Sequence, residues 1–184
     1  MTRNRFLVSG ILKRTMESVD SIIEAIRLAF AGVVRGKITL HEAEVIDSYG
    51  SKEERAEARR LDSESRWGRV PDSHIEECTT ALCHLDPAGW KYYVPAYMIW
   101  SLQYFRESDS LVSDHTIYTF DPQMDDPRLR EYALARHRLL DEAQSRAVCR
   151  FLRYMAANDG CVNGRAAKAA LAAYWARYCE VEPS

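Results

Sequence analysis

Apolar residues recur along most of the chain at the three- and four-residue intervals of an amphipathic helix. The clearest run begins at residue 19 and consists of Val19, Ile22, Ile23, Ile26, Phe30, Val33 and Val34. Two capping boxes follow, Thr39 with Glu42 and Ser51 with Glu54, and each predicts the start of another helix. Residues 52–66 are highly charged, and we expect them to form an exposed helix stabilised by side-chain pairs rather than by burial.

One segment is apolar nearly all the way round a helix. Asp86 and Pro87 form an N-cap and a first-turn proline, and the run that they open holds Trp90, Tyr92, Tyr93, Val94, Ala96, Tyr97, Met98, Ile99, Trp100, Leu102, Tyr104 and Phe105. A helix with no polar face has to be surrounded by other helices, so residues 87–106 are predicted to form the centre of the fold. Pro95 is expected to kink this helix, because proline lacks the backbone N–H and crowds the carbonyl four residues earlier.

The pattern changes after the central helix. Within residues 108–122, β-branched and aromatic side chains follow one another from Thr116 to Phe120 before Asp121 and Pro122. Such residues favour extended backbone, and proline favours a turn, so we expect an ordered loop or a short extended segment here.

Helices are expected to resume near Leu129. Asp141 with Gln144 predicts a cap for one more helix, and the alanine-rich residues 166–178 predict a last one. There is no internal repeat and no sustained heptad, which excludes a solenoid and a coiled coil. The whole pattern predicts an all-α fold, an irregular helical domain of six to eight helices around the central aromatic-rich helix at about residues 87–106.

Length and composition fit this fold class. A chain of 184 residues suits one helical domain over residues 1–184, with residues 1–17 as an N-terminal extension. The hydrophobic fraction of 47% and the charged fraction of 28% are typical of a globular protein. The apolar stretch at residues 6–12 makes a poor signal peptide and is too short to span a bilayer, so no membrane association is expected.

The cysteines point to a compartment. They are five, an odd number without paired metal spacing: Cys78, Cys83, Cys149, Cys161 and Cys179. This pattern suits free thiols in a reducing environment better than a disulfide framework. We therefore predict a cytoplasmic protein.

Charge is distributed unevenly although the net charge is only −2. Residues 17–86 carry nine basic and fifteen acidic side chains, whereas residues 128–179 carry ten basic and four acidic ones. Either the two halves attract each other within the fold, or one of them is a charged docking surface. Arg146, Arg150 and Arg153 form a basic stripe along one predicted helix, and Arg136 and Arg138 come just before it. The slightly acidic net charge and the absence of a nucleic-acid-recognition motif argue against a nucleic-acid partner.

Several short pieces resemble a known family when they are taken in order. They are Leu40 to Glu44 with Asp47 to Gly50, Trp67 with Val70 and Pro71, Leu85 to Pro87, Pro95 to Met98, Ser108 to Ser110, and Tyr118 with Asp121 and Pro122. Together they resemble an uncharacterised bacterial family, domain of unknown function 6714, over roughly residues 20–157. The resemblance implies a helical bacterial protein, and it brings neither an activity nor a site residue.

Three histidines have a carboxylate one helical turn later. The pairs are His41 with Glu44, His74 with Glu77, and His137 with Asp141. Two helices that each supply a histidine and a glutamate could hold a metal ion between them, although the di-iron pattern has the glutamate first. The alternative is that these pairs are ordinary surface ion contacts.

Other chemical signatures are weak. Cys78, Cys83 and His84 lack the spacing of a zinc site, and three consecutive residues, Ser113 to His115, cannot form a catalytic triad. No nucleotide-binding or nucleophile-elbow motif is present, and no cofactor is predicted. The tyrosines of the central helix belong either to the core or to a pocket or partner surface.

Two functional hypotheses follow. The first is a small cytoplasmic binding protein that acts through protein–protein contact, an immunity- or antitoxin-like inhibitor of a basic toxin or effector. Its partner-facing residues are predicted to be Glu44, Asp47, Asp109 and Asp114.

The alternative is a metal-dependent, hydrolase-like enzyme with a site between helices. Its metal ligands are predicted to be His41, Glu44, His74 and Glu77. A metal ion there would activate water while a carboxylate shuttles the proton.

Overall fold

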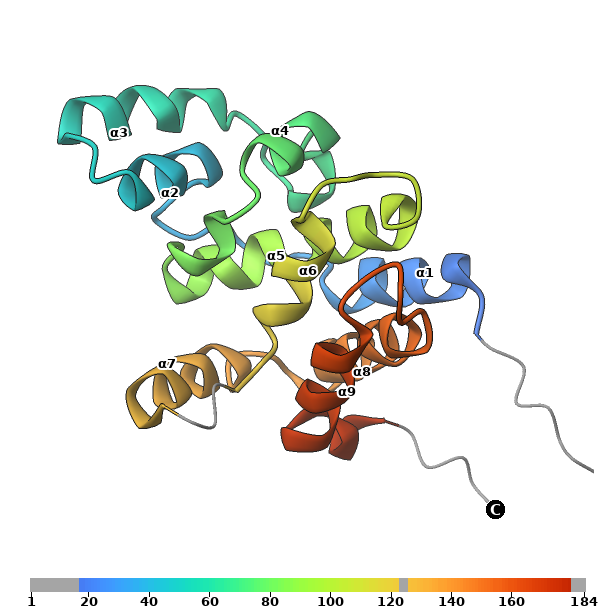
Figure 1. Cartoon of the computed structure of the whole chain (residues 1–184). Helices are drawn as coiled ribbons and strands as arrows, with labels where there is room; N and C mark the ends of the chain where they lie inside the picture. The colour runs from blue at the N-terminus through green and yellow to red at the C-terminus, as the bar shows by residue number, and fades with distance from the viewer. Residues whose placement is uncertain (1–16, 123–125, 180–184) are drawn as a thin grey trace, which may run out of the picture.

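The computed structural model describes residues 17–122 and 126–179, and these residues form nine α-helices and four short 3-10 helices with no strand (Figure 1). The all-α prediction is confirmed. The elements are α1 (Val19–Ala29), α2 (Leu40–Asp47), α3 (Lys52–Ala58), η1 (Arg59–Leu61), η2 (Trp67–Arg69), α4 (Asp72–Glu77), η3 (Ala81–Cys83), α5 (Pro87–Tyr104), α6 (Val112–Tyr118), α7 (Pro127–His137), α8 (Glu142–Ala157), α9 (Gly164–Ala173) and η4 (Trp175–Tyr178). Nearly all of the predicted N-terminal extension lies outside the described residues.

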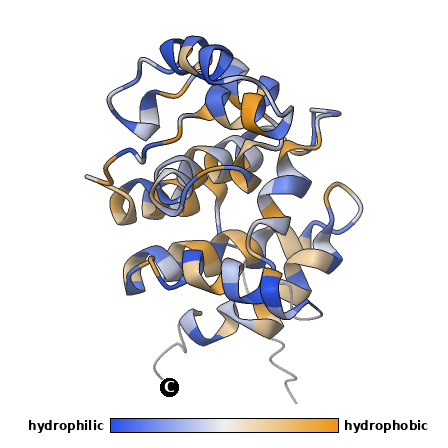
Figure 2. Ribbon diagram, turned by 90° about the vertical axis from the view of Figure 1, so that its left-hand side faces the viewer, coloured by the Kyte–Doolittle hydropathy of each residue, from blue (hydrophilic) through white to orange (hydrophobic). Residues whose placement is uncertain are grey.

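Helix α5 is the centre of the fold, as its all-round apolar sequence predicts. Its buried residues are Gly89, Trp90, Tyr92, Tyr93, Val94, Pro95, Ala96, Tyr97, Met98, Trp100, Ser101 and Leu102. In Figure 1, α2, α3 and α4 lie on one side of α5, and α7, α8 and α9 lie on the other. Hydrophobic residues concentrate where the helices face one another, whereas the outlying α3 is mostly hydrophilic (Figure 2).

Helix α1 packs against both α5 and α8. The amphipathic pattern of this helix buries Ile22, Ile23 and Ile26. Its end is held from two sides, because the Trp67 indole N–H donates to the Phe30 carbonyl at 2.9 Å and the Gln144 amide donates to the Ala29 carbonyl at 3.2 Å. These bonds join the two halves of the chain at one point.

The prediction of a loop or extended segment at residues 108–122 is wrong in its middle, where the chain forms α6. This helix buries Val112, Ser113, Thr116 and Ile117, which is the spacing of one helix face. Tertiary burial of that face overrides the strand preference of β-branched residues. This extra short helix contributes to a total of nine α-helices, rather than six to eight, in the described residues.

The predicted basic stripe and the two arginines before it do not form one exposed surface. The Arg136 side chain is buried and donates hydrogen bonds to the carbonyls of Leu82, Cys83 and Leu85. Arg150 is engaged with Glu17 beside α1. Part of the charge asymmetry is therefore used inside the fold, where basic residues of the second half hold the first half.

Two of the five cysteines are paired, which corrects the prediction of five free thiols. Cys149 of α8 and Cys179 after η4 form a disulfide, while Cys78, Cys83 and Cys161 are free. The two cysteines are 30 residues apart in sequence, so no local pattern indicates that they pair. Among the described residues, no helix has both the length and the apolar composition that a bilayer crossing requires.

Candidate functional site

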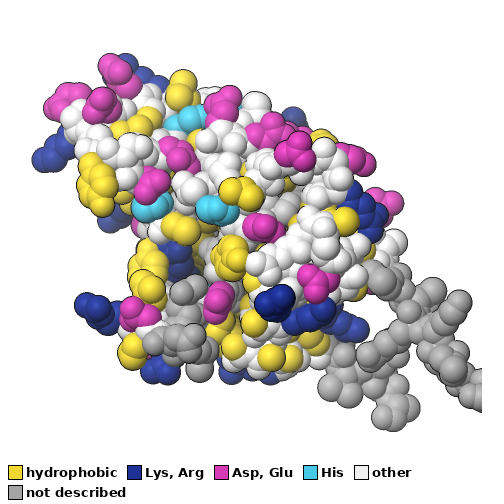
Figure 3. Space-filling view, in the orientation of Figure 1, with side chains coloured by type: hydrophobic (Ala, Val, Ile, Leu, Met, Phe, Trp, Pro, Cys, Tyr) yellow, Lys and Arg dark blue, Asp and Glu magenta, His cyan; other side chains and the backbone are white. Residues whose placement is uncertain are grey.

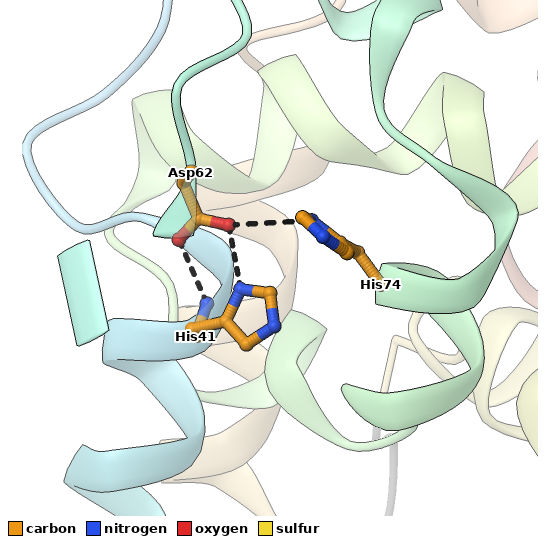
Figure 4. Close-up of side chains that lie close together, drawn as sticks. All are labelled: His41, Asp62 and His74. Carbon is orange, nitrogen blue, oxygen red and sulfur yellow. Dashed lines mark hydrogen bonds and ion pairs between the residues drawn. The ribbon is translucent and has the colours of Figure 1, made fainter. Parts of the chain in front are cut away.

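Two histidines and an aspartate from three separate elements converge on one side of α5. His41 lies in the first turn of α2, Asp62 directly follows η1, and His74 lies on α4 (Figure 4). One ligand atom of each residue lies within 4.8 Å of the other two. Figure 3 shows that acidic side chains are frequent on the surface over α2, α3 and α4.

Asp62 binds His41 twice. Its Oδ2 accepts the backbone N–H of His41 at 2.9 Å, and its Oδ1 lies 2.7 Å from His41 Nδ1. The Nδ1 atom of His74 is 4.0 Å from the same Oδ1. The two imidazole rings meet edge to face with centroids 4.6 Å apart. Both histidines thus present a ring nitrogen toward one carboxylate.

A buried ion pair network sets the position of Asp62. Glu42 of α2 is only 1% exposed and accepts hydrogen bonds from Arg55 of α3 and Arg59 of η1. Burial alone would raise the pKa of the Glu42 carboxyl, but these hydrogen bonds, with a further one from the Thr39 N–H, hold it below its ordinary value. This network fastens α3 and η1 to α2, so the residue after η1 falls beside His41.

Arg35 fixes the backbone on the other side of Asp62. Its guanidinium donates to the Asp62 carbonyl at 2.7 Å and to the Glu64 carbonyl at 3.2 Å. It therefore holds the main chain of this segment and not the Asp62 carboxylate.

The electrostatics of this cluster are unusual for a buried carboxylate. The Asp62 side chain is 1% exposed, and among the described residues no arginine or lysine pairs with it. His74 Nδ1 is also buried and has no hydrogen-bond partner in this part of the chain. A buried carboxylate is normally paired with a cation, and a buried nitrogen normally finds a partner. A metal ion bound by all three residues would satisfy both.

The donor set suits a transition metal. Two imidazoles and one carboxylate with a remaining open position is the pattern of catalytic zinc sites, and also of one class of iron(II) site. Tetrahedral bonds of about 2.1 Å place ligand atoms about 3.4 Å apart. The 2.7 Å His41–Asp62 contact would have to widen and the 4.0 Å His74–Asp62 separation would have to shorten, each by less than about 1 Å.

The structure brings together only some of the four metal ligands predicted from the sequence. His41 and His74 come together as expected. Glu77 stays close, with its Oε2 3.5 Å from His41 Nε2, but its side chain is 66% exposed. Glu44 turns away, and its Oε1 accepts both the N–H and the hydroxyl of Thr80. The carboxylate between the two histidines is instead Asp62, which the helical spacing did not indicate.

Three of the four predicted partner-facing acids lie on two helices, and the fourth precedes one of these helices. Glu44 and Asp47 belong to α2, and Asp47 pairs with His84 at 3.0 Å. Asp114 lies in α6 and accepts the N–H of Asn163 at 2.8 Å, while Asp109 precedes that helix and is exposed. Glu44, Asp47 and Asp114 therefore have partners within the chain.

The third histidine of the predicted pairs lies elsewhere. His137 is buried against Trp90, Tyr174 and Trp175, and its Nε2 lies 3.2 Å from the Thr119 carbonyl. Burial lowers the pKa of His137 to about 4. It is a neutral core histidine, and Asp141 caps α8 instead of pairing with it.

The cysteines near the site do not supply a reactive thiolate. Cys78 follows α4 and is buried, and its burial raises the pKa of its thiol, with Glu44, Asp62 and Glu77 acting in the same direction. Cys83 is exposed, but partial desolvation by the surrounding protein also raises the pKa of its thiol. Both thiols therefore stay protonated at neutral pH.

Comparison with known protein families identifies the family of this chain. The model of the family of unknown function DUF6714 matches residues 18–179. No curated protein and no solved structure matches the chain.

Proposed function

The chain belongs to the family of unknown function DUF6714, and from the geometry of its site we propose that it is a metal-dependent, hydrolase-like enzyme with His41, Asp62 and His74 as ligands. One observation carries this proposal: the buried Asp62 carboxylate lies between two imidazole nitrogens, and no arginine or lysine of the described chain pairs with it. Zinc is the metal that this set suits for hydrolysis, because zinc has no redox chemistry and takes two histidines with one carboxylate in several hydrolases.

The surrounding residues suit such chemistry. A bound zinc ion brings the pKa of its water near 7, which supplies a nucleophile at neutral pH. With His41 coordinating through Nδ1, its Nε2–H would face Glu77, and a carboxylate there fixes the ring orientation. Glu77 is also an exposed carboxylate in contact with the cluster and can accept a proton, whereas Glu42 and Glu44 are engaged elsewhere. Arg35 keeps Asp62 in place through its carbonyl.

The decisive experiment is a zinc titration of the metal-free protein by calorimetry, followed by measurement of the metal content of the purified protein. We expect one zinc ion per chain, and a loss of at least about 100-fold in affinity for His41→Ala, His74→Ala and Asp62→Asn, since each variant removes one ligand. Glu44→Gln and His84→Ala are matched controls, a carboxylate and a histidine of the same region outside the cluster, and should bind zinc normally.

Zinc binding that survives in the three ligand variants would refute the site. Preference for iron(II) over zinc would keep the site and replace hydrolysis by oxygen chemistry. For the activity itself, a panel of carboxylic and phosphoric esters should show turnover that a chelator removes and zinc restores, and Asp62→Asn should lower kcat by at least about 100-fold.

A second candidate is an inhibitor that acts through protein contact in the bacterial cytoplasm, of the immunity or antitoxin type. Tyr49 supports it, because this side chain is 97% exposed in the turn between α2 and α3, with Asp47 close by in sequence. Tyr49 also has a φ of 56°, a left-handed conformation that a bulky side chain rarely adopts. Exposed tyrosines are frequent anchors of interfaces, and an acidic surround suits a basic partner.

Co-purification from the native host tests this second candidate. We expect one stoichiometric partner, which is lost in high salt and in Tyr49→Asn, a substitution that suits the left-handed backbone and so leaves the fold intact. Leu129→Ala is the control, because Leu129 is a half-exposed residue on α7. Equal recovery of the partner with both variants would exclude this surface.

A further inference from the structure

A large groove lies beside the end of α1, η2 and the C-terminal half of α5. It encloses about 1020 Å³ and is walled by residues 31–35, by residues 64–70 and by Ala96, Ile99, Trp100 and Gln103 of α5. Small-molecule sites in proteins usually measure roughly 300–1,000 Å³. The groove is therefore large enough for a small organic ligand.

The wall of the groove is basic. It carries Arg27, Arg35, Arg66 and Arg69. Within the described part of the chain, Arg35 is the only one of the four in an ion pair, which it forms with Glu64 at 3.5 Å. The other three guanidinium groups are exposed and have no carboxylate partner in the described residues, although the protein as a whole is slightly acidic. Arginine clusters of this kind favour carboxylate, sulfonate or phosphate groups.

The acidic groups of the same wall are already engaged. Glu64 accepts the hydroxyl of Tyr93 at 2.8 Å in addition to its pair with Arg35. Asp72 accepts the hydroxyl of Tyr104 at 2.9 Å. Neither carboxylate takes up Arg27, Arg66 or Arg69, so the positive charge faces the groove.

One buried donor in the groove wall has no acceptor. The chain has four tryptophans, and three of them donate their indole N–H within the fold, to Phe30 O, Thr119 Oγ1 and Phe120 O. The exception is Trp100, which lines the groove, is 1% exposed, and has an Nε1 without a hydrogen-bond partner among the described residues. An unpaired buried donor is costly, and a ligand that brings an acceptor would remove that cost.

The remaining wall is apolar. Val33, Val34, Val70, Ile75 and Ile99 line the groove together with the indole of Trp67. Val34 is 80% exposed, so the apolar part of the wall is accessible from the surface. A ligand that matches this wall combines an acidic group with a flat apolar body.

We propose that this groove binds a small organic anion with an aromatic body, whose acidic group contacts Arg27, Arg66 and Arg69 and whose acceptor takes the Trp100 N–H. The site does not depend on the proposed metal centre, which has its own ligands. The two share the segment from Asp62 to Ile75, which contributes Asp62 and His74 to the metal cluster and residues 64–70, Asp72 and Ile75 to the groove. They also share Arg35, which lines the groove and donates to the Asp62 carbonyl.

A matched pair of fluorescent probes tests the proposal. 8-Anilinonaphthalene-1-sulfonate carries an aromatic body and an anion, and N-phenyl-1-naphthylamine is the same body without the charge. Fluorescence titration of the full chain should give one saturable site that binds the sulfonate at least tenfold more tightly than the amine. Similar affinity for both probes would overturn the anionic part of the proposal, and no saturable binding would overturn all of it.

Variants locate the bound probe. The double variant Arg27→Gln and Arg69→Gln should weaken sulfonate binding at least tenfold and amine binding less than twofold. Trp100→Phe, which removes the N–H and keeps a ring, should weaken sulfonate binding severalfold. The control is Arg153→Gln with Arg165→Gln, two exposed arginines outside the groove lining that should leave binding unchanged. Equal binding in the two double variants would place the probe elsewhere.

The same titration separates this proposal from the metal site. Asp62→Asn and His41→Ala should bind the sulfonate normally, because neither residue lines the groove. A loss of sulfonate binding in these variants would show that the groove is not an independent site, and so would contradict the proposal. Zinc affinity in the Arg27 and Arg69 double variant should stay normal.

Discussion

Histidines on the two sides of α5 lie in opposite surroundings. On the α2–α4 side, His41 and His74 meet the buried carboxylate of Asp62 and remain partly accessible, with 12% and 24% of their side chains exposed. On the side of α7–α9, His137 lies among Trp90, Tyr174 and Trp175. The first surroundings suit a metal ion, and the second favour the neutral ring.

The difference teaches that local spacing does not decide the role of a histidine. All three histidines have an acid one helical turn later in sequence. In the structure, Glu44, Glu77 and Asp141 each contact a residue other than the histidine one turn before them. What each ring meets is set by elements distant in the chain, Asp62 after η1 for His41 and Trp175 in η4 for His137. The following predictions test this contrast, from the largest expected effect to the smallest.

Removal of the aromatic wall should have the largest effect. Trp175 is fully buried against His137 and Phe120, and Trp175→Ala should lower the free energy of unfolding by about 3–5 kcal/mol because it leaves a large cavity. Water that enters the cavity should also raise the pKa of His137, which NMR titration can follow. Zinc affinity at the other side should not change, and a parallel loss there would contradict the contrast.

Reduction of the disulfide should act on the same side. The bond joins residues 30 positions apart and ties the end of η4, which carries Trp175, to α8. Loss of a loop of this length should cost about 3–4 kcal/mol in denaturant unfolding with a reducing agent. Cys149→Ala with Cys179→Ala should behave like the reduced protein. As a control, a reducing agent should have no effect on the stability of that double variant and its full effect on the native chain.

Acid should destabilise the protein through His137. Its pKa is lowered to about 4 in the folded chain from an ordinary value of 6.5, so between these values the unfolded chain binds more protons than the folded one. Stability is therefore full above pH 6.5 and falls as the pH drops toward 4, by about 3 kcal/mol in total. The free energy of unfolding, measured between pH 4 and 6.5, should lose this pH dependence in His137→Gln. The control His84→Gln, at a surface histidine, should keep it.

Neutralising Asp62 should cost the least stability. In the metal-free protein, Asp62→Asn keeps the shape and one acceptor, so the loss should be about 1 kcal/mol, far below that of Trp175→Ala. Thermal unfolding of the two variants side by side measures this difference. A cost for Asp62→Asn as large as that for Trp175→Ala would mean that the His41–Asp62–His74 cluster serves the fold rather than a metal ion.

Much of the fold is predictable from local sequence because local rules govern it. The all-round apolar run predicts the central position of α5, and the Ser51–Glu54 and Asp141–Gln144 boxes predict the starts of α3 and α8, which the structure confirms. Helix α6 escaped prediction because its β-branched residues prefer strands when they are considered without their tertiary contacts.

The site is predictable only in part. His41 and His74 were identified from their spacing, but Asp62 lies after a short 3-10 turn, with no periodic pattern to mark it. Its approach to His41 depends on the pairing of Glu42 with Arg55 and Arg59, a contact across two helices. The disulfide and the buried Arg136 likewise depend on contacts 30 and about 50 residues away, which one sequence does not reveal.

The position of α1 affects how the protein folds during its synthesis on the ribosome. This helix is made before the other described helices, yet it packs on α8, and the bond from Gln144 to Ala29 joins residues 115 positions apart. At synthesis rates of about 5–20 residues per second, roughly 6–23 s pass between the synthesis of Ala29 and that of Gln144. During this interval Ile22, Ile23 and Ile26 are not yet covered by α8, so the nascent chain offers a transient binding segment to chaperones until α8 emerges.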